Sequence, residues 1–245
     1  MNQVQTQQKG VKTYLTETGI ELKLSVDIIR RQLVSGAGNI TDQEANFFMA
    51  LCSSQGLNPF IKEAYIIKYG DKSPATMIVG KDVIFRRGTN HPDFDGLESG
   101  VIVIHKETGE LEYKRGAFYN KKTEELVGAW ATVHRKSWKY PIGAEVNFDE
   151  YAQRKNDGSL NNMWSTKPAT MITKVAKVHA LREAFTESLQ GMYDADEMGV
   201  DTSKLEQPGQ AAIQQSQQEI IDIDPDDMPF DHKQAPKKND GRKFL

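Results

Sequence analysis

Apolar positions in the first quarter of the chain recur at the three- and four-residue spacing of amphipathic helices. Ser25 is a favoured N-cap residue and predicts the start of a helix, which the Gly-rich residues 36–39 end. The segment Thr41-Asp42-Gln43-Glu44 has the capping-box pattern and precedes a second apolar helical stretch, which Gly56 ends. Two short helices are therefore predicted before residue 57.

From residue 64 onward the pattern changes to alternation and β-branched residues, which predicts strands. Residues 64–67 and 76–79 are two such strands, with a Gly70-Asp71 turn between them and a short helix around 82–87 after them. Turn residues then divide the stretch 100–148 into strands that we expect to form a run of antiparallel hairpins. The predicted strands are 101–104, 111–118, 129–135 and 142–148.

The longest helical pattern begins just after Pro168 and covers about residues 169–189, ending near Gly191. Its apolar residues fall on one stripe, as expected of a helix that packs on a sheet. The predicted fold class is therefore α+β, with an antiparallel β-meander packed on one long helix and N-terminal helices before it. The stripe consists of Met171, Val175, Val178, Leu181, Phe185 and Leu189.

Composition divides the chain into a folded domain and two termini. Residues 1–10 are Gln-rich and are not expected to order, and residues 11–200 are expected to form one domain with one sizeable core. Residues 201–245 are rich in Gln, Ser, Pro and acidic residues, and they contain few large apolar groups. Burial could not offset the ordering entropy of such a segment, so we expect a flexible acidic tail.

The single cysteine, Cys52, excludes a disulfide within the chain and a cysteine-based zinc cluster. It lies in an apolar helical pattern, which favours a buried structural thiol in a reducing compartment. The sequence shows neither the apolar stretch of a signal peptide nor the roughly 20 apolar residues of a membrane span. We therefore expect a cytoplasmic protein without membrane contact.

The formal net charge of −3 gives no overall basicity, so any nucleic-acid surface must come from local segregation of charge. Basic and aromatic residues interleave over 113–139, as in a groove where cations neutralise phosphates and rings stack on bases. The alternative is that these rings form the core of the sheet and the charges its solvated face. The candidate contacts here are Lys114, Arg115, Arg135 and Lys136.

Two further basic sets are candidates for phosphate contacts. Lys174 and Lys177 are three residues apart on the long helix and share a face between its apolar positions, although an ordinary solvated face is equally compatible. The second set follows the predicted strand 76–79 and means little alone. These sets add Lys167, Lys174, Lys177 and Arg182 on the helix, and Lys81 and Arg86 after the strand.

Enzymatic chemistry finds little support in the sequence. Asp194, Asp196 and Glu197 could suggest the metal site of a nuclease, but their place just past a helix end favours capping. The five histidines have no metal-ligand spacing, and no phosphate-binding Gly-x-x-x-x-Gly-Lys-Ser/Thr loop occurs. No catalytic residue, metal or cofactor is predicted.

Three separated motifs resemble one known family in one order over roughly residues 40–198. Gly56-Leu57-Asn58-Pro59-Phe60 with Lys62-Glu63-Ala64-Tyr65, then Val79-Gly80-x-Asp82, are similar to the helix-to-strand junction and the next turn of RecT/Red-beta phage annealing proteins. The third motif resembles the long helix of that family and its exit. It comprises Trp164-Ser165-x-x-Pro168, Ala180-x-Arg182-x-Ala184-Phe185 and Gly191-x-Tyr193-Asp194-x-Asp196-Glu197.

The resemblance implies a β-β-β-α core, assembly into rings or helical filaments, and a basic groove that holds DNA extended with its bases accessible. Lys62 and Arg182 stand where the family has basic residues, whereas Ala169 and Val175 occupy two of its other basic positions. The implied function is ATP-independent binding of single-stranded DNA and annealing of complementary strands in phage-type homologous recombination, through an annealed duplex intermediate. We expect the groove between the strands of 113–139 and the long helix.

Two other functions remain open at this point. One is a non-annealing accessory or loader protein that coats single-stranded DNA, and the other is a nuclease, which we expect to be absent. A phage exonuclease is the implied partner of an annealing protein.

The tail contains one motif of its own, Asp226-Asp227-Met228-Pro229-Phe230. It resembles the acidic tip by which bacterial single-strand-binding proteins recruit partners, although there the phenylalanine ends the chain. A tail that uses Asp226, Asp227, Pro229 and Phe230 in this way would contact host single-strand-binding or replication proteins. The alternative is an unstructured acidic spacer.

Overall fold

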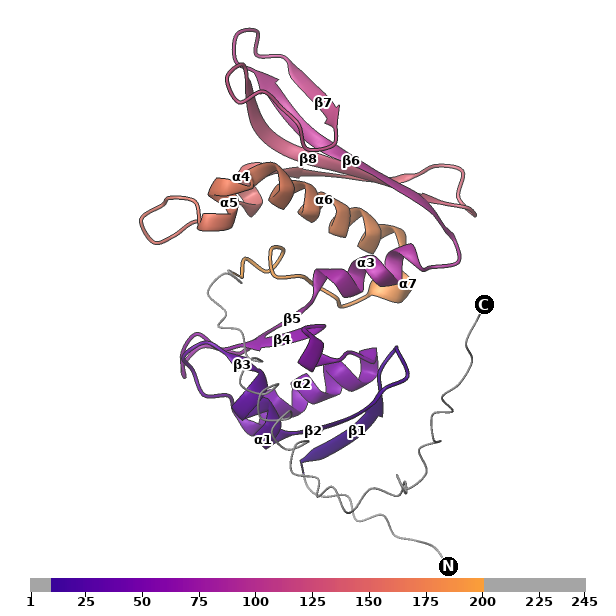
Figure 1. The fold of residues 1–245 in the computed structure, drawn as a ribbon, viewed down its shortest axis with the longest axis vertical. Coiled ribbons are helices and arrows are strands. Elements are labelled where there is room, and N and C mark those ends of the chain that lie inside the picture. Colours follow the sequence, from indigo (N-terminus) through magenta and orange to yellow (C-terminus); the bar gives the residue numbers. More distant parts are fainter. Residues whose placement is uncertain (1–9, 201–245) are drawn as a thin grey trace, which may run out of the picture. The chain divides into compact units, whose positions relative to one another are not determined.

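The computed structural model describes residues 10–200 of the protein. The predictions for the first nine residues and for the tail, including its Asp226–Phe230 motif, lie outside the described residues. Figure 1 shows the described elements, which mix helices with two- to four-stranded sheets and confirm the α+β class. No helix within residues 10–200 has both the length and the apolar character that a bilayer span requires.

The described part of the chain begins with a hairpin that the hydrophobic pattern did not predict. Strands β1 (Val11–Leu15) and β2 (Glu21–Ser25) pair antiparallel, and most of their residues are exposed or half-buried. Ser25 then caps α1 (Val26–Ile28) by accepting a hydrogen bond from the Ile28 amide at 3.1 Å, as predicted. The helix continues as a π-helical turn over Ile29–Leu33.

Helix α2 (Asp42–Gln55) is built as its end signals predict. Thr41 and Glu44 form a reciprocal capping box, and Gly56 ends the helix in the left-handed conformation at φ 59°. Cys52 is fully buried on this helix, and burial raises the pKa of its thiol to about 12. The prediction that this thiol is buried is confirmed.

A three-stranded sheet follows, in the order β3-β4-β5. Strand β3 (Val34–Ser35) runs parallel to β4 (Ala64–Ile67), and β5 (Thr76–Val79) pairs antiparallel with β4. Between β5 and helix α3 (Lys81–Thr89), a Cβ on Gly80 would lie 2.6 Å from the carbonyl oxygen of Lys62. The Val79-Gly80 turn therefore requires a residue without a side chain.

The four-stranded sheet is antiparallel, but its strand order departs from chain order at one point, where β6 pairs with β8. It consists of β6 (Phe94–His105), β7 (Leu111–Arg115), β8 (Glu124–Arg135) and β9 (Ile142–Asn147) in the order β7-β6-β8-β9. A simple meander would pair β8 with β7, whereas β8 pairs with β6 along almost its whole length. Both of these strands have twelve residues and buried centres, so they form the middle of the sheet, and the short β7 lies at its edge.

Helix α6 (Pro168–Ala184) packs beneath this sheet, against β8, β9 and β6 (Figure 1). It is shorter than predicted because Phe185 leaves the helical conformation at φ −128° and ψ 52°. The ring of Phe185 is fully buried beside His91, so tertiary packing ends the helix and α7 (Thr186–Leu189) follows. Two short helices, α4 (Phe148–Tyr151) and α5 (Asn162–Thr166), precede α6.

Candidate nucleic-acid interface

The space between the middle of β8 and α6, which is part of where we expected the groove, is hydrophobic core. Ala129, Ala131 and Val133 of β8 belong to one buried cluster with Val175 and the rest of the helix stripe. A strand of DNA has no room there. This part of the expected location therefore cannot hold a DNA strand, and the candidate contacts are considered by the surfaces on which they lie.

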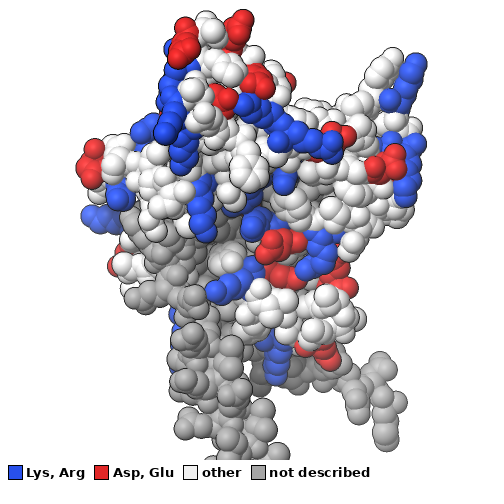
Figure 2. Space-filling model, turned by 45° about the horizontal axis from the view of Figure 1, so that its top comes forward, with Lys and Arg blue, Asp and Glu red and all other residues white. Residues whose placement is uncertain are grey.

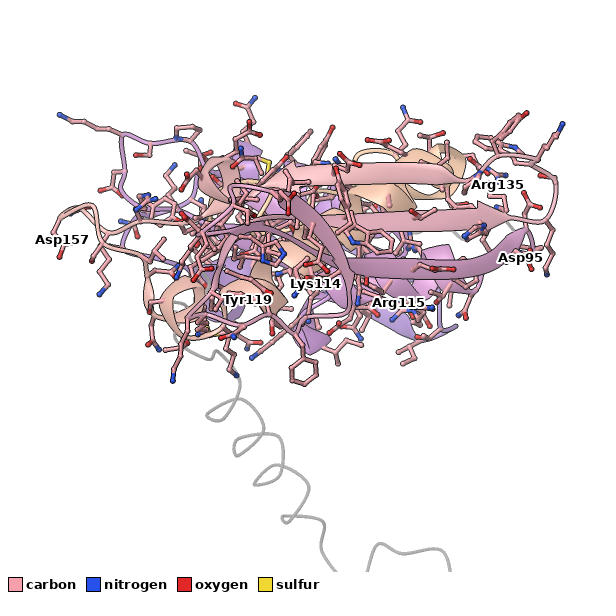
Figure 3. The ribbon with its side chains drawn as sticks, turned by 90° about the horizontal axis from the view of Figure 1, so that it is seen from above. Asp95, Lys114, Arg115, Tyr119, Arg135 and Asp157 are labelled. Carbon is pink, nitrogen blue, oxygen red and sulfur yellow. The ribbon has the colours of Figure 1, made fainter. Side chains whose placement is uncertain are left out.

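Arg135 is held by carboxylates within the fold. Its side chain is only 12% exposed, and it contacts Asp93 at 2.7 Å and Glu187 at 3.0 Å. The guanidinium also lies 4.6 Å from the ring centroid of Trp138. Figure 3 shows Arg135 at one end of the sheet, well separated from Lys114, so these two candidates do not share one site. Arg135 connects the sheet to α7.

Arg86 belongs to a second internal ion-pair group. Its guanidinium contacts Glu17 at 3.1 Å and Glu63 at 2.8 Å, and the neighbouring Arg87 contacts Glu17 at 3.0 Å. These pairs connect α3 to the β1–β2 turn and to the start of β4. Hydrogen bonds from both arginines outweigh partial burial and lower the pKa of Glu17.

The acidic segment after α7 neutralises two of the helix candidates. Lys174 lies 3.2 Å from Asp194 and also contacts Asp196, while Arg182 pairs with Glu197. Asp194 accepts a hydrogen bond from the Glu197 amide at 3.0 Å, and Glu197 accepts one from the Asp194 amide at 3.1 Å. The predicted capping role of this segment is confirmed, and its carboxylates also serve as counter-ions for α6.

Both burial and the neighbouring charges shift pKa values in this ion-pair cluster. Burial lowers the pKa of Lys174, but Asp194 and Asp196 outweigh that effect and raise it overall. Burial raises the pKa of Asp196, against the opposing charges of Lys174 and Lys81. Lys81 at the start of α3 and Lys174 on α6 therefore act on the same carboxylate, although nearly a hundred residues separate them along the chain.

Lys114 forms the centre of a polar cluster on the four-stranded sheet. Its ammonium lies 2.5 Å from Glu124 and 3.5 Å from Glu112, which in turn lies 2.8 Å from His105. One ligand atom from each of the three acidic and histidine residues falls within 4.8 Å of the others, a spacing that suits a divalent cation. The Lys114 ammonium, however, already supplies the opposing charge. Spacing along the sequence could not reveal this cluster, because its members come from three strands.

Six of the candidates remain exposed or without a close carboxylate among residues 10–200. Arg115 is 79% exposed and lies 3.9 Å from Glu98, and Lys81 is half-exposed and 4.0 Å from Asp82. The remaining four, Lys62, Lys136, Lys167 and Lys177, form no ion pair with any described residue. Figure 2 shows Lys and Arg side chains gathered over the hairpin end of the four-stranded sheet and the surface below it.

Exposed rings and further lysines, most of them within the basic and aromatic stretch 113–139, extend this surface. Phe118 is 92% exposed and Tyr140 is 73% exposed, whereas Trp130 is half-buried and donates to the Lys114 carbonyl at 3.2 Å. The two interpretations of residues 113–139 thus each describe some of the rings. The additional exposed lysines lie in the turns of the sheet, where their high local density was the available signal: Lys106, Lys121, Lys122 and Lys139.

Comparison with known proteins gives one family and one relative. The family model described as "RecT family" matches residues 21–210. A protein of Ureaplasma parvum serovar 3, described as "Uncharacterized protein UU154", is 26% identical over 171 residues, which cover 70% of this chain. The chain spans about 60% of the length of that relative. The name of the relative states no activity, so the family match carries the functional meaning.

Proposed function

Because the chain belongs to the RecT family, we propose that it binds single-stranded DNA and anneals complementary strands without ATP, in phage-type homologous recombination. The observation that carries this proposal is the family match over residues 21–210, which takes in most of the described fold. The three ordered sequence motifs lie within the same range. A non-annealing loader protein is the alternative, and no particular feature favours it.

We propose that the candidate cations divide into two roles. Those that lack a close carboxylate would neutralise phosphates directly, while exposed rings such as Phe118 and Tyr140 would offer stacking surfaces. Those held in ion pairs would position the elements that carry the first set. The proposed direct contacts are Lys62, Lys81, Arg115, Lys136, Lys167 and Lys177, and the proposed positioning residues are Arg86, Lys114, Arg135, Lys174 and Arg182.

Annealing breaks no covalent bond, so the proposed activity requires no nucleophile and no nucleotide hydrolysis. It requires that each strand is held by its backbone while base edges stay free to test pairing. Copies of the chain side by side, in a ring or filament, would align many nucleotides and convert a bimolecular search into a local one. The proposal therefore includes a homo-oligomer, and a phage exonuclease that supplies the single strand.

A mixing experiment tests the annealing activity. Complementary labelled oligonucleotides are combined with the protein in the absence of ATP, and pairing is followed by fluorescence energy transfer. We expect pairing to be faster than in the protein-free mixture. Strand binding without acceleration would establish the loader alternative, and cleavage that depends on divalent metal would establish a nuclease.

The salt dependence of binding tests the direct contacts on α6. The double variant Lys167→Ala, Lys177→Ala should lower the slope of log affinity against log salt by roughly 0.7 for each phosphate that is no longer neutralised. The matched control is Lys12→Ala, Lys23→Ala, which removes two exposed charges from the β1–β2 hairpin. Equal slopes for the two variants, at equal stability, would show that the α6 lysines do not contact phosphate.

For the tail we propose a separate role in recruiting host single-strand-binding or replication proteins through Asp226, Asp227, Pro229 and Phe230. Deleting residues 222–230 should abolish co-purification with such proteins and leave annealing by the purified protein unchanged. Unchanged co-purification would contradict the role and favour an acidic spacer.

A further inference from the structure

A cavity of about 360 Å³ lies where the β7–β8 turn meets the start of α6. The start of β8, helices α4 and α5, Lys106 of the β6–β7 turn and Leu160 of the loop before α5 complete its lining. Tyr119 of the β7–β8 turn is part of this lining, and Figure 3 shows Tyr119 well separated from Arg135 at the other end of the sheet. The cavity volume falls within the range of small-molecule sites.

The inner side of the cavity is aromatic. Tyr119 and Phe148 are half-buried there, and Trp164 is fully buried. The rings of Phe148 and Trp164 meet edge to face, with their centroids 5.6 Å apart. Flat aromatic walls of this kind suit a planar ring, and every nucleobase offers one.

Trp164 adds a specific polar requirement. Its indole N–H is buried and has no hydrogen-bond acceptor among the described residues. A buried donor without an acceptor is unfavourable, and buried polar groups in proteins are almost always paired. Trp164 lines the cavity, so an acceptor that entered far enough to reach this N–H would pair with it, and all four nucleobases carry ring-nitrogen or carbonyl acceptors.

The outer side of the cavity favours an anion. Pro168 begins α6, and its N-cap residue, Lys167, provides no side-chain hydrogen bond to the first turn of this 17-residue helix. Pro168 has no backbone N–H, so the first N–H groups of α6 are those of Ala169 and Thr170, and the helix dipole favours a negative charge at this end. Lys106 and Lys121 also line the cavity, and the Lys106 ammonium donates to the Lys121 carbonyl at 2.7 Å.

Two carboxylates share the lining and have to be compatible with an anion. Glu124 is buried, and it accepts hydrogen bonds from Lys114 at 2.5 Å and from the Asn120 amide at 2.8 Å. These interactions lower its pKa, with the Lys114 hydrogen bond as the largest cause, and they compensate its charge. Glu125 is exposed to solvent and shares the lining with the two lysines.

We propose that this cavity takes one nucleotide of a bound DNA strand, with the base against Tyr119, Phe148 and Trp164 and the phosphate at the start of α6. The inference rests on the proposed function, since the strand is the source of the nucleotide. A base held here is withdrawn from pairing. It anchors the strand to each copy of the chain while the neighbouring bases stay free to pair.

Tryptophan fluorescence measures directly whether a ligand occupies this cavity. The chain has three tryptophans, so the variant Trp130→Phe, Trp138→Phe retains Trp164 as its single reporter. We expect oligo(dT) and thymidine monophosphate to quench Trp164 emission, and inorganic phosphate at equal concentration to leave it unchanged. Equal quenching by phosphate would show that the cavity binds an anion and does not recognise a base. Quenching by the free nucleotide alone would show that the cavity does not take a nucleotide of a bound strand.

Anisotropy of a labelled oligonucleotide, recorded in the same titration, separates this inference from the proposed function. Strand binding without any change in Trp164 emission would contradict the proposed nucleotide site and leave the proposed annealing function unaffected. Absence of strand binding altogether would overturn the proposed function instead.

Replacement of Trp164 by Phe keeps a ring and removes the N–H. The protein with Trp164 should bind oligo(dT) several-fold more tightly than the same oligonucleotide with abasic positions, because only the former fills the cavity. Trp164→Phe should reduce this preference, and because the smaller ring leaves a core cavity and lowers the melting temperature, the two proteins are compared at equal folded concentration. An unchanged preference would show that the indole donor does not recognise a base.

Discussion

Replacement of Lys174 by Met is expected to destabilise the fold by about 3–5 kcal/mol, the cost of removing one partner from a buried ion pair. The side chains of Asp194 and Asp196 are 2% and 5% exposed, and their Oδ2 atoms meet Lys174 but no other hydrogen-bond donor among the described residues. Without the ammonium, two buried carboxylates would lose the counter-charge that they share. Urea unfolding followed by circular dichroism measures the loss of stability.

Two control variants make this prediction specific. Lys177→Met removes a lysine from the same helix, but one without an ion pair among the described residues, and should change stability by at most about 0.5 kcal/mol. The triple variant Lys174→Met, Asp194→Asn, Asp196→Asn removes all three charges and should recover most of the stability. Equal effects of Lys174→Met and Lys177→Met would mean that Lys174 is a solvent-facing charge.

The pH dependence of the Lys174→Met variant provides an independent signature. Burial already raises the pKa of Asp196 with the ammonium in place, and removing the ammonium should raise it further above the unfolded value of about 3.9. A carboxyl group whose folded pKa is raised binds protons more tightly when folded, so acid favours the folded state. The deficit relative to the parent protein should therefore be largest at neutral pH and shrink as the pH falls towards the unfolded pKa.

Local signals in the sequence predicted local structure well. The Thr41–Glu44 capping box, Ser25 and Gly56 each act within a few residues, and each ends or begins a helix as expected. The apolar stripe of α6 is buried as predicted. The β1–β2 hairpin was missed because its strands are short and mostly exposed, so hydrophobic alternation gives little signal there.

Sequence patterns did not predict which residues far apart in the chain pair or pack together. Strand β7 lies at the edge because β6 pairs with β8, although β7 separates these two strands along the chain. Helix α6 ends early because Phe185 packs beside His91. Charge patterning identified Lys174 as basic and helical, but only the fold brings Asp194 and Asp196 to it. A basic residue in the sequence is therefore a candidate for DNA contact only until its counter-ion within the fold is known.

Substitution of Gly100 by Ala is expected to cost about 3 kcal/mol, at the upper end of the range for an overpacked site. A Cβ at Gly100 would lie 1.7 Å from the Lys114 carbonyl oxygen and 2.7 Å from the Trp130 indole nitrogen. Because this carbonyl belongs to the backbone of β7, it cannot move aside by a change of rotamer as a flexible side chain can. Strand β7 would therefore have to separate from β6. That strand carries Lys114 and Arg115, so the variant should also bind single-stranded DNA more weakly at equal folded concentration.

Gly143→Ala is the matched control for this substitution, because it adds the same methyl group to β9, the other edge of the same sheet. Its nearest neighbours would lie 3.9 Å and 4.0 Å away, an ordinary van der Waals distance, and the position is exposed. Stability and strand affinity should therefore stay close to those of the parent protein. If Gly100→Ala were tolerated equally well, β7 would not be fixed against β6, and the polar cluster around Lys114 could not position the surface proposed for DNA.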